Sequence, residues 1–177
     1  MSEGRISENE ALKYRRLAFY ADDIERLNNL LSTGVKKSSA ICILLIDKDG
    51  HLVAKQGFMQ KIDSASLSAL VAGSFASTAQ VAKLLDEDGF DVLFHQGSSK
   101  SIHIRLVGER TLQVGVWPSD IKGGMIQVYT KELAASIGEV IEEIANRSED
   151  DAPADAGLSE GFSDEMKSHL DNLFGDL

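Results

Sequence analysis

Residues 41–54 read ICILLIDKDGHLVA, and this stretch decides the fold. The run Ile41–Ile46 is apolar and rich in β-branched side chains, which is typical of a central β-strand. The segment Asp47–Gly50 has the Asp and Gly residues that favour a tight turn, and His51–Ala54 has the composition of a second strand. The stretch therefore predicts a β-hairpin whose first strand lies inside a sheet.

Outward from the hairpin, the spacing of apolar residues predicts three helices and three more strands. The expected elements are a helix from Tyr20 to Gly34, a long helix over residues 63–87, strands at 90–94, 102–107 and 112–117, and a helix that ends near Asn146. Pro118 ends the last strand, because proline has no backbone N–H to donate. This order predicts an α+β fold, α-β-β-α-β-β-β-α, in which a five-stranded antiparallel sheet has helices on both faces.

The last two expected strands alternate in polarity. One side of the pattern consists of Ile102, Ile104, Leu106, Leu112, Val114 and Val116, and the other of Ser101, His103, Arg105, Gln113 and Gly115. Alternation of this kind predicts that one face of the sheet packs on the core and that the other meets a more polar environment.

The long helix has two apolar faces. The bulky face consists of Leu67, Leu70, Val71, Val81, Leu84 and Leu85, and we expect it to cover the sheet. The second face is a stripe of small residues, Ala65, Ala69, Ala72, Ala76 and Ala79. An alanine stripe can reflect helix propensity alone. Because the bulky face already supplies the core contact, this stripe favours the close approach of another molecule.

The composition is that of one globular domain with a short acidic tail. Of the net charge of −10, residues 148–177 contribute −8, because they contain nine Asp or Glu residues and one basic residue, Lys167. The remainder is nearly neutral and has no basic stripe, so nucleic acid is not an expected partner. No apolar run approaches membrane-spanning length, and the single cysteine, Cys42, is expected to be buried and inert. These features predict a cytoplasmic protein without membrane insertion.

We find no pattern that indicates catalytic, metal or cofactor chemistry. The histidines at positions 51, 95, 103 and 169 lack metal-ligand spacing, and we expect them to face solvent. The Asp47–Gly50 turn has the Asp-x-Asp-Gly start of a calcium loop, but the twelfth position is Phe58 and not a bidentate glutamate. Glycine-rich phosphate loops and a Gly-x-Ser-x-Gly nucleophile turn are also missing. We therefore expect no metal, no cofactor and no enzymatic activity of the chain's own.

Four segments are expected along the chain. Residues 1–16 form a poorly ordered extension, residues 17–147 the folded domain, residues 148–158 an acidic flexible linker, and residues 159–177 an amphipathic helix. The apolar stripe of that last helix consists of Phe162, Met166, Leu170, Leu173, Phe174 and Leu177, and Ser163 is a suitable N-cap. A helix this short is marginal alone, so it either binds a partner or folds back onto the domain.

Several of these segments resemble bacterial Roadblock proteins of the MglB type. The resemblance rests on the hairpin segment Leu44–Gly50, the helical segments Leu67–Gly73 and Ala82–Leu85, the strand end Phe94–Gly97, and the ending Leu170–Phe174. It runs from about Leu17 to the end of the chain, and it implies that residues 17–147 form a Roadblock domain. Residues 1–16 are an extension that the family does not require.

The resemblance implies a homodimer that binds one MglA-like small Ras-family GTPase, in a two-to-one complex, and stimulates its GTP hydrolysis. Regulators of this type insert no arginine finger, since the GTPase supplies its own catalytic residues and the dimer favours the switch conformation that aims them. Arg105 and Arg110, in or beside expected strands, agree with this. The family also suggests a role in cell polarity or gliding motility, with concentration at a cell pole.

The site residues are carried over from the same resemblance. The GTPase-binding surface is expected at Ala65, Ala69, Ala72, Ala76, Ala79 and Gln80, and a second GTPase contact at Phe162, Met166, Leu170, Leu173 and Phe174. The dimer is expected to join through the long helix and the strand after it, with Phe90, Val92 and Phe94 at the interface. One sheet would then run across two subunits, and no unpaired edge would be left to aggregate there.

Two other functions stay open. A Roadblock dimer can be an assembly adaptor that does not stimulate hydrolysis, as the Roadblock light chains of dynein are, and fold alone does not decide between the two. A small-molecule sensor is the third interpretation, because helices over a sheet can enclose a ligand. The expected sheet offers few convergent polar groups inside an apolar pocket, which argues against a sensor.

Overall fold

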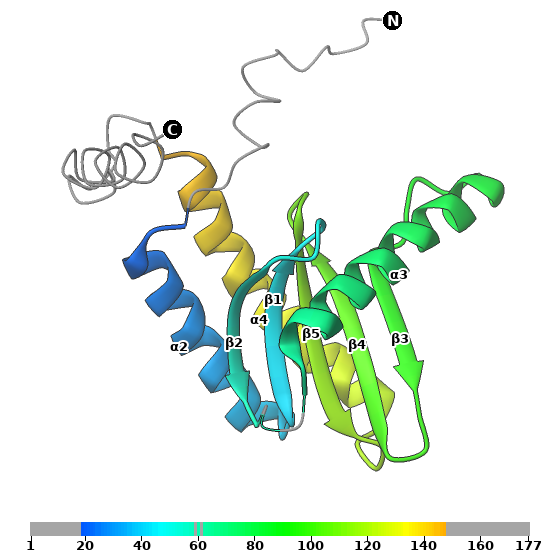
Figure 1. Cartoon of the computed structure of the whole chain (residues 1–177), viewed down its shortest axis with the longest axis horizontal. Helices are drawn as coiled ribbons and strands as arrows, with labels where there is room; N and C mark the ends of the chain where they lie inside the picture. The colour runs from blue at the N-terminus through cyan, green and yellow to red at the C-terminus, as the bar shows by residue number, and fades with distance from the viewer. Residues whose placement is uncertain (1–18, 59, 61, 148–177) are drawn as a thin grey trace, which may run out of the picture. The chain divides into compact units, whose positions relative to one another are not determined.

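The computed structural model of the chain describes residues 19–58, 60 and 62–147 (Figure 1). The helices are α2 (Ala21–Ser38), α3 (Ser64–Leu84) and α4 (Gly123–Ala145), and the strands are β1 (Cys42–Asp47), β2 (Leu52–Gly57), β3 (Val92–Gln96), β4 (Lys100–Val107) and β5 (Thr111–Pro118). This order confirms the predicted α+β fold. The expected extension 1–16, linker 148–158 and helix 159–177 lie outside the described residues.

The strands form one antiparallel sheet in the order β2-β1-β5-β4-β3. Strand β1 pairs with β2 on one side and with β5 on the other, which makes it internal, and Cys42–Ile46 is buried throughout. The hairpin prediction is therefore confirmed, although β2 runs on to Gly57, past the expected end at Ala54. Strands β2 and β3 lie at the two edges of the sheet (Figure 1).

The turn between β1 and β2 is organised by one carboxylate. The side chain of Asp47 accepts hydrogen bonds from the backbone N–H groups of Asp49, at 2.9 Å, and His51, at 2.8 Å. Burial acts to raise the pKa of Asp47, but the hydrogen bonds from His51 and Asp49 outweigh it and leave the pKa below its ordinary value. The carboxylate therefore holds the chain reversal, as expected for Asp in a tight turn.

Helix α2 does not end at Gly34, as the sequence predicts, but continues to Ser38. Gly34 lies inside the helix, at a point where α4 comes close. A Cβ atom at Gly34 would lie within 2.6 Å of the Leu133 side chain, so a glycine leaves room for α4. The residue that ends the helix is Ser39, which adopts the left-handed conformation with φ of 57°. Gly34 thus serves helix packing instead of helix termination.

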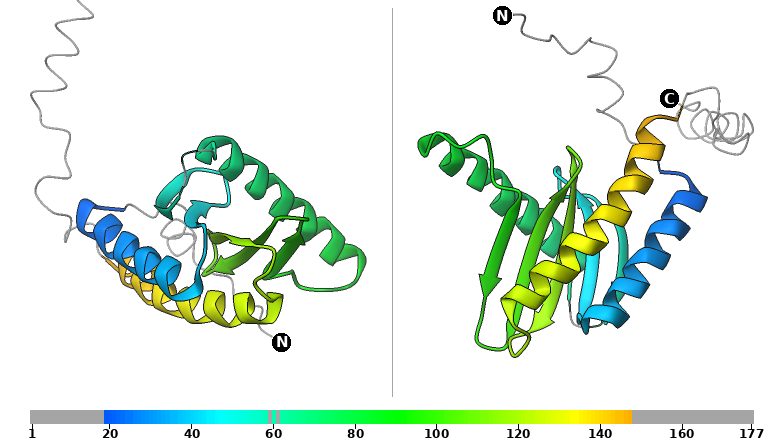
Figure 2. Two further views of the ribbon diagram at one scale, coloured as in Figure 1. Left: turned by 90° about the horizontal axis from the view of Figure 1, so that it is seen from below. Right: turned by 180° about the vertical axis from the view of Figure 1, so that it is seen from behind.

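The sheet lies between two helical layers. Helices α2 and α4 cover one face and α3 crosses the other, as the two views of Figure 2 show. The α2/α4 core is formed mainly by Leu27, Leu31, Ile43, Leu45, Trp117, Ile126, Ile137, Val140, Ile141 and Ile144. The α3 core is formed by Cys42, Leu44, Ile46, Val71, Ala72, Phe75, Ile104, Leu112, Val114 and Val116. Alternate residues of β1 and β5 therefore belong to opposite cores, which follows from the two-residue repeat of a strand.

Helix α3 is long and apolar enough to cross a membrane by length and composition alone. This differs from the expectation that no segment approaches membrane-spanning length. The criterion is weak, because a helix that packs on the core of a globular domain also meets it. One side of α3 does pack on the sheet in this structure.

Candidate functional site

The first candidate site is the side of α3 that faces away from the sheet. The inward side is formed by Ser68, Val71, Ala72, Phe75 and Ala82. The outer surface of α3, defined here by its exposed residues, consists of Ala65, Ser66, Ala69, Leu70, Gly73, Ala76, Ser77, Ala79, Gln80, Val81, Lys83 and Leu84. The helix begins at Asp63, whose carboxylate accepts hydrogen bonds from Ser66 and Ala65 that lower its pKa. Its start is thus fixed while its outer surface is left uncovered.

The prediction that the bulky face of α3 covers the sheet is wrong in part. Val71 is buried and Leu67 half-buried, but Leu70 is 73% exposed and Leu84 is 84% exposed. Val81 and Leu85 are exposed as well, because Ala82 takes the inward position in the last turns. Figure 1 and Figure 2 show the cause, since the C-terminal half of α3 extends past the edge strand β3, where no strand lies beneath it.

The alanine stripe divides in the same way. Ala72 is only 5% exposed and belongs to the α3 core, so its methyl group faces the sheet. Ala65, Ala69, Ala76, Ala79 and Gln80 are exposed, as the expected contact surface requires. Of the six residues predicted to bind the GTPase, five therefore lie on the outer surface of α3, and Ala72 lies on the side of the helix that faces the sheet.

Strand β3 lies beside this surface and pairs only with β4. Val92 pairs with Arg105 and Phe94 with His103, while Phe90 precedes the strand. The Phe94 ring is partly exposed and lies 6.2 Å from the His103 ring, centroid to centroid. The outer backbone edge of β3 is consequently open to another strand.

The second candidate site lies on the opposite face of the sheet, under α4. The sequence predicts a polar environment for this face, and the prediction is wrong: Ser101, His103 and Gln113 are all buried there. The structure shows no hydrogen bond to Ser101 Oγ, His103 Nδ1, Arg105 Nε or either amide atom of Gln113. Unpaired buried polar atoms are scarce in folded proteins, so a cluster of them marks this face as unusual.

His103 is also an exception to the expectation that the histidines face solvent. His51 and His95 are exposed, but His103 is 2% exposed. Burial, and then the neighbouring Arg105 guanidinium, lower the pKa of His103 to about 4. The ring is therefore neutral at physiological pH.

Trp117 forms the end of the same polar face. A Cβ atom at Gly115 would come within 2.1 Å of the Trp117 ring, so only glycine leaves room for the indole to lie across β5. The indole N–H donates to the backbone oxygen of Ser38, at 3.2 Å, and lies 3.3 Å from the Ser38 hydroxyl. This contact ties β5 to the last turn of α2.

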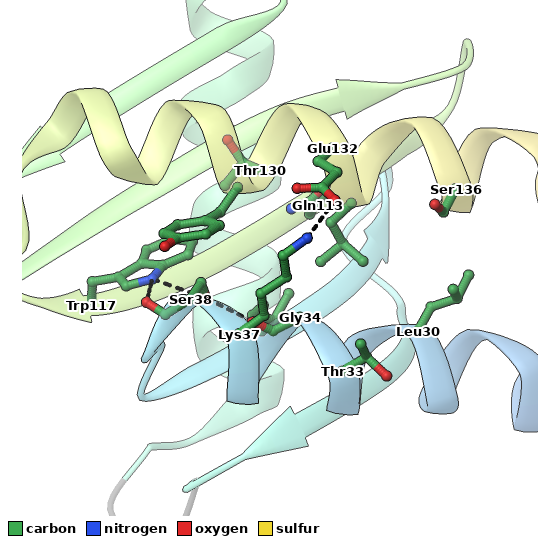
Figure 3. Close-up of a pocket in the computed structure, with 13 residues that line it drawn as sticks. Leu30, Thr33, Gly34, Lys37, Ser38, Gln113, Trp117, Thr130, Glu132 and Ser136 are labelled. Atoms are coloured by element: carbon green, nitrogen blue, oxygen red, sulfur yellow. Dashed lines mark hydrogen bonds and ion pairs between the residues drawn. The ribbon is translucent and has the colours of Figure 1, made fainter.

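A cavity of about 100 Å³ lies next to Trp117, between α2, α4 and the sheet. Figure 3 shows its lining: Leu30, Thr33, Gly34 and Lys37 of α2, Thr130, Glu132 and Ser136 of α4, and Gln113 and Trp117 of β5. Lys37 and Glu132 form an exposed ion pair that joins the two helices. Gln113 is the one buried polar residue of this face that also lines the cavity.

Comparison with known proteins decides the family. The profile of the Roadblock/LC7 domain matches residues 28–114, from α2 into β5. MglB of Myxococcus xanthus is 26% identical to the chain, with a TM-score of 0.70, over 75% of this chain and 99% of that one. The chain contains a Roadblock/LC7 domain. No curated protein sequence matches it.

Two further Roadblock structures are similar at the same level. The gliding protein MglB of Thermus thermophilus is 28% identical, with a TM-score of 0.67, over 71% of this chain and 96% of that one. An MglB with a tetrameric arrangement is 28% identical, with a TM-score of 0.68, over 72% of this chain and 96% of that one. The similarity thus covers most of this chain and nearly all of each relative.

The described part of this Roadblock chain offers little for catalysis. Cys42 is fully buried, and burial raises the pKa of its thiol to about 11, which confirms the expected inert cysteine. Within residues 19–147 as described, no group of three or more His, Cys, Asp or Glu residues is placed to hold a metal ion.

Sequence reasoning missed the cavity and the exposed end of α3. The sequence feature that could have indicated the cavity is Gln113, a glutamine inside the otherwise apolar run Leu112–Val116. A carboxamide is costly to bury unless a polar group or a ligand contacts it. The signal for the second was Leu84-Leu85, which places two bulky residues on different sides of one helical turn. The second GTPase contact predicted at residues 162–174 lies outside the described residues.

Proposed function

We propose that this protein is a homodimeric activator of an MglA-like small Ras-family GTPase, bound as two protomers to one GTPase. The carrying observation is the uncovered outer surface of α3 beside the open edge of β3, in a Roadblock fold similar to MglB over most of the chain. The fold identifies no function by itself, so the proposal rests on this surface. In such a role the protein is cytoplasmic and concentrated at a cell pole, in the service of cell polarity or gliding motility.

The homodimer is the first part of the proposal. Pairing of β3 with its copy would extend the sheet across two protomers and cover the open edge. Phe90, Val92 and Phe94 lie on or directly before that strand. The overhanging end of α3 would then lie against the partner, which gives Leu84 and Leu85 an apolar environment that the single chain does not offer.

The GTPase contact is the second part. Ala65, Ala69, Ala76 and Ala79 have small side chains, so a partner can approach the helix backbone closely, and Gln80 adds a hydrogen-bonding group at the end of the row. Two such helices side by side would form one surface for a single GTPase. A single GTPase on a symmetric dimer meets the two protomers unequally, which accounts for the proposed two-to-one ratio.

The mechanism requires no arginine from this chain. Arg110 is held by Asp49, with 2.7 Å between Nη2 and Oδ2, and Arg26 is held by Glu143, at 2.7 Å. Arg105 lies on β4 with its Nε buried. Arg26 thus lies in α2 and Arg105 in β4, while Arg110, in the turn between β4 and β5, is engaged by Asp49. The dimer would instead act by binding one switch conformation of the GTPase more tightly than the other.

The decisive experiment is single-turnover GTP hydrolysis by the cognate MglA-like GTPase, with and without two equivalents of this protein. Acceleration by an order of magnitude or more, about 1.4 kcal/mol or more off the barrier, is the expected result. Binding without acceleration would replace the activator with the adaptor interpretation. Absence of binding would contradict both.

A matched pair of variants tests the surface. Ala76→Arg places a long charged side chain on the outer surface of α3 and should abolish GTPase binding, because a charge would be buried without a partner. Ala135→Arg places the same side chain at an exposed position of α4, on the other face of the sheet, and should bind normally. Retained binding by Ala76→Arg would show that the contact lies elsewhere.

The C-terminal segment is proposed as a second GTPase contact. The stripe Phe162, Met166, Leu170, Leu173 and Phe174 has the spacing of helix-in-groove recognition. Deletion of residues 159–177 should weaken GTPase binding and leave the dimer intact, as measured by titration and by sedimentation. Unchanged GTPase affinity would contradict the proposal.

A further inference from the structure

The open edge of β3 presents a defined set of backbone groups. The Leu106 N–H donates to the Asp91 carbonyl and the Gly97 N–H donates to the Lys100 carbonyl, each at 2.8 Å. In an antiparallel pair of strands, hydrogen-bonded residues alternate with residues whose N–H and C=O groups point away from the neighbouring strand. Both bonds fall on odd-numbered residues at the ends of β3, so the even-numbered residues point outward. These are Val92, Phe94 and Gln96.

The edge of β3 is complementary to a second copy of itself in one register. Two copies of a strand pair about a twofold axis, so the residue at the axis lies opposite its own copy. With Phe94 at the axis, Val92 lies opposite Gln96 of the second copy, and all three outward-pointing residues exchange backbone hydrogen bonds. With the axis at Leu93 or His95, one of the three has no partner within the strand, which is unfavourable. We propose that the protein dimerises with Phe94 at the axis.

The Phe94 side chain is placed for such a contact. Its ring lies on the α4 face of the sheet, 6.2 Å from the ring of His103 in the neighbouring strand, centroid to centroid. A Cβ atom at Gly123 would lie 3.4 Å from Cζ of Phe94, so the start of α4 borders the same ring. The side chain is still 38% exposed, because β3 is an edge strand (Figure 2). In the proposed register the two Phe94 rings become cross-strand neighbours, and aromatic pairs of this kind stabilise a sheet.

This register deepens the proposed homodimer and rests on it. The two proposals can nevertheless fail separately. A dimer joined through the exposed apolar residues of α3 alone would leave β3 unpaired, and it would still be a homodimer with two α3 surfaces for a GTPase. The experiment must therefore detect the dimer and the register by different measurements.

Single cysteines detect the register, because the native Cys42 is fully buried and does not compete. Phe94→Cys, Leu93→Cys and His95→Cys each place a thiol at one possible axis of the full-length protein. Residues opposite each other have Cα atoms about 4.5–5.5 Å apart, within the range of a disulfide, whereas residues displaced by two positions are about 7–8 Å apart. Mild oxidation should therefore shift Phe94→Cys to a linked dimer on a non-reducing denaturing gel, and it should leave the other two variants as single chains.

A second pair of variants serves if Phe94→Cys does not fold. Val92→Cys and Gln96→Cys, mixed and allowed to exchange subunits, should form a linked dimer, and neither should link to itself. Sedimentation of the wild type detects the dimer independently. A dimer that links at Leu93, at His95 or at none of these positions would overturn the register and leave the proposed homodimer standing. A monomer at every concentration would contradict the homodimer and the register together.

Discussion

The two faces of the sheet are covered in different ways. The α2/α4 face is closed by two helices of the same chain, and yet it holds Ser101, His103 and Gln113 beneath them. The buried strand residues of the α3 face are apolar, but that helix leaves its own outer surface uncovered. The α2/α4 face is thus covered by helices but holds some polar side chains inside. The α3 face is apolar inside, and the outer side of its helix is exposed to solvent.

This difference gives the two faces different roles. The buried polar side chains of the closed face are cut off from water by their own chain, so they bear on the stability of the fold. An uncovered apolar helix beside an open strand edge selects proteins, because only a large partner can remove so much surface from water. The open side of α3 is therefore the surface suited to a protein partner.

The largest effect is expected from a cavity on the closed face. Leu31 is fully buried between α2 and the sheet, so Leu31→Ala should lower the free energy of unfolding by about 2–5 kcal/mol. Chemical denaturation at neutral pH measures the loss, which should not depend on protein concentration. A loss under about 1 kcal/mol would mean that the α2/α4 layer relaxes and is not closed.

The second effect concerns the polar interior of the same face. The pKa of His103 is about 4 in the folded protein and 6.5 without the fold, so between these values the unfolded chain binds more protons. The free energy of unfolding should therefore rise with pH across this window and fall on acidification, by at most about 3 kcal/mol from this group. Urea denaturation at pH 4.5, 5.5 and 7.0 measures the slope.

His103→Gln provides the control for that slope. The carboxylates of the chain titrate partly in the same range, but they are common to both proteins, so the difference between the two profiles isolates His103. The variant should lose less stability than the wild type between pH 7 and pH 4.5. Parallel profiles would show that the ring gains a proton in the folded state without penalty, and so is not enclosed.

Local patterns in the sequence predict most of this fold. The run Ile41–Ile46 and the Asp47–Gly50 turn predict the central hairpin, and Pro118 marks the end of β5. Each of these features depends on residues close together in the chain. They could be read correctly because strand periodicity and turn chemistry are local properties.

The errors lie where distant segments meet. The polar side of β4 and β5 is buried by α4, which the alternation of Ile104 and His103 cannot reveal. Helix α3 is apolar on several sides, so its sequence does not show which residues face the sheet; Val71 does, and Leu84 does not. Gly34 is likewise a residue type that often ends helices, but here it lies within α2 and leaves room for the Leu133 side chain of α4. Tertiary contacts decide all three.

The smallest effect is expected from the same substitution on the open face. Leu84 is exposed near the end of α3, so Leu84→Ala should change the free energy of unfolding of the single chain by no more than about 0.5 kcal/mol. Denaturation at concentrations where sedimentation shows monomers measures this, with Leu31→Ala as the matched control. At higher concentration Leu84→Ala should weaken self-association, because Leu84 then loses apolar contacts with a second protomer. A loss near that of Leu31→Ala in the monomer would mean that the end of α3 packs on its own chain, and the contrast between the two faces would fail.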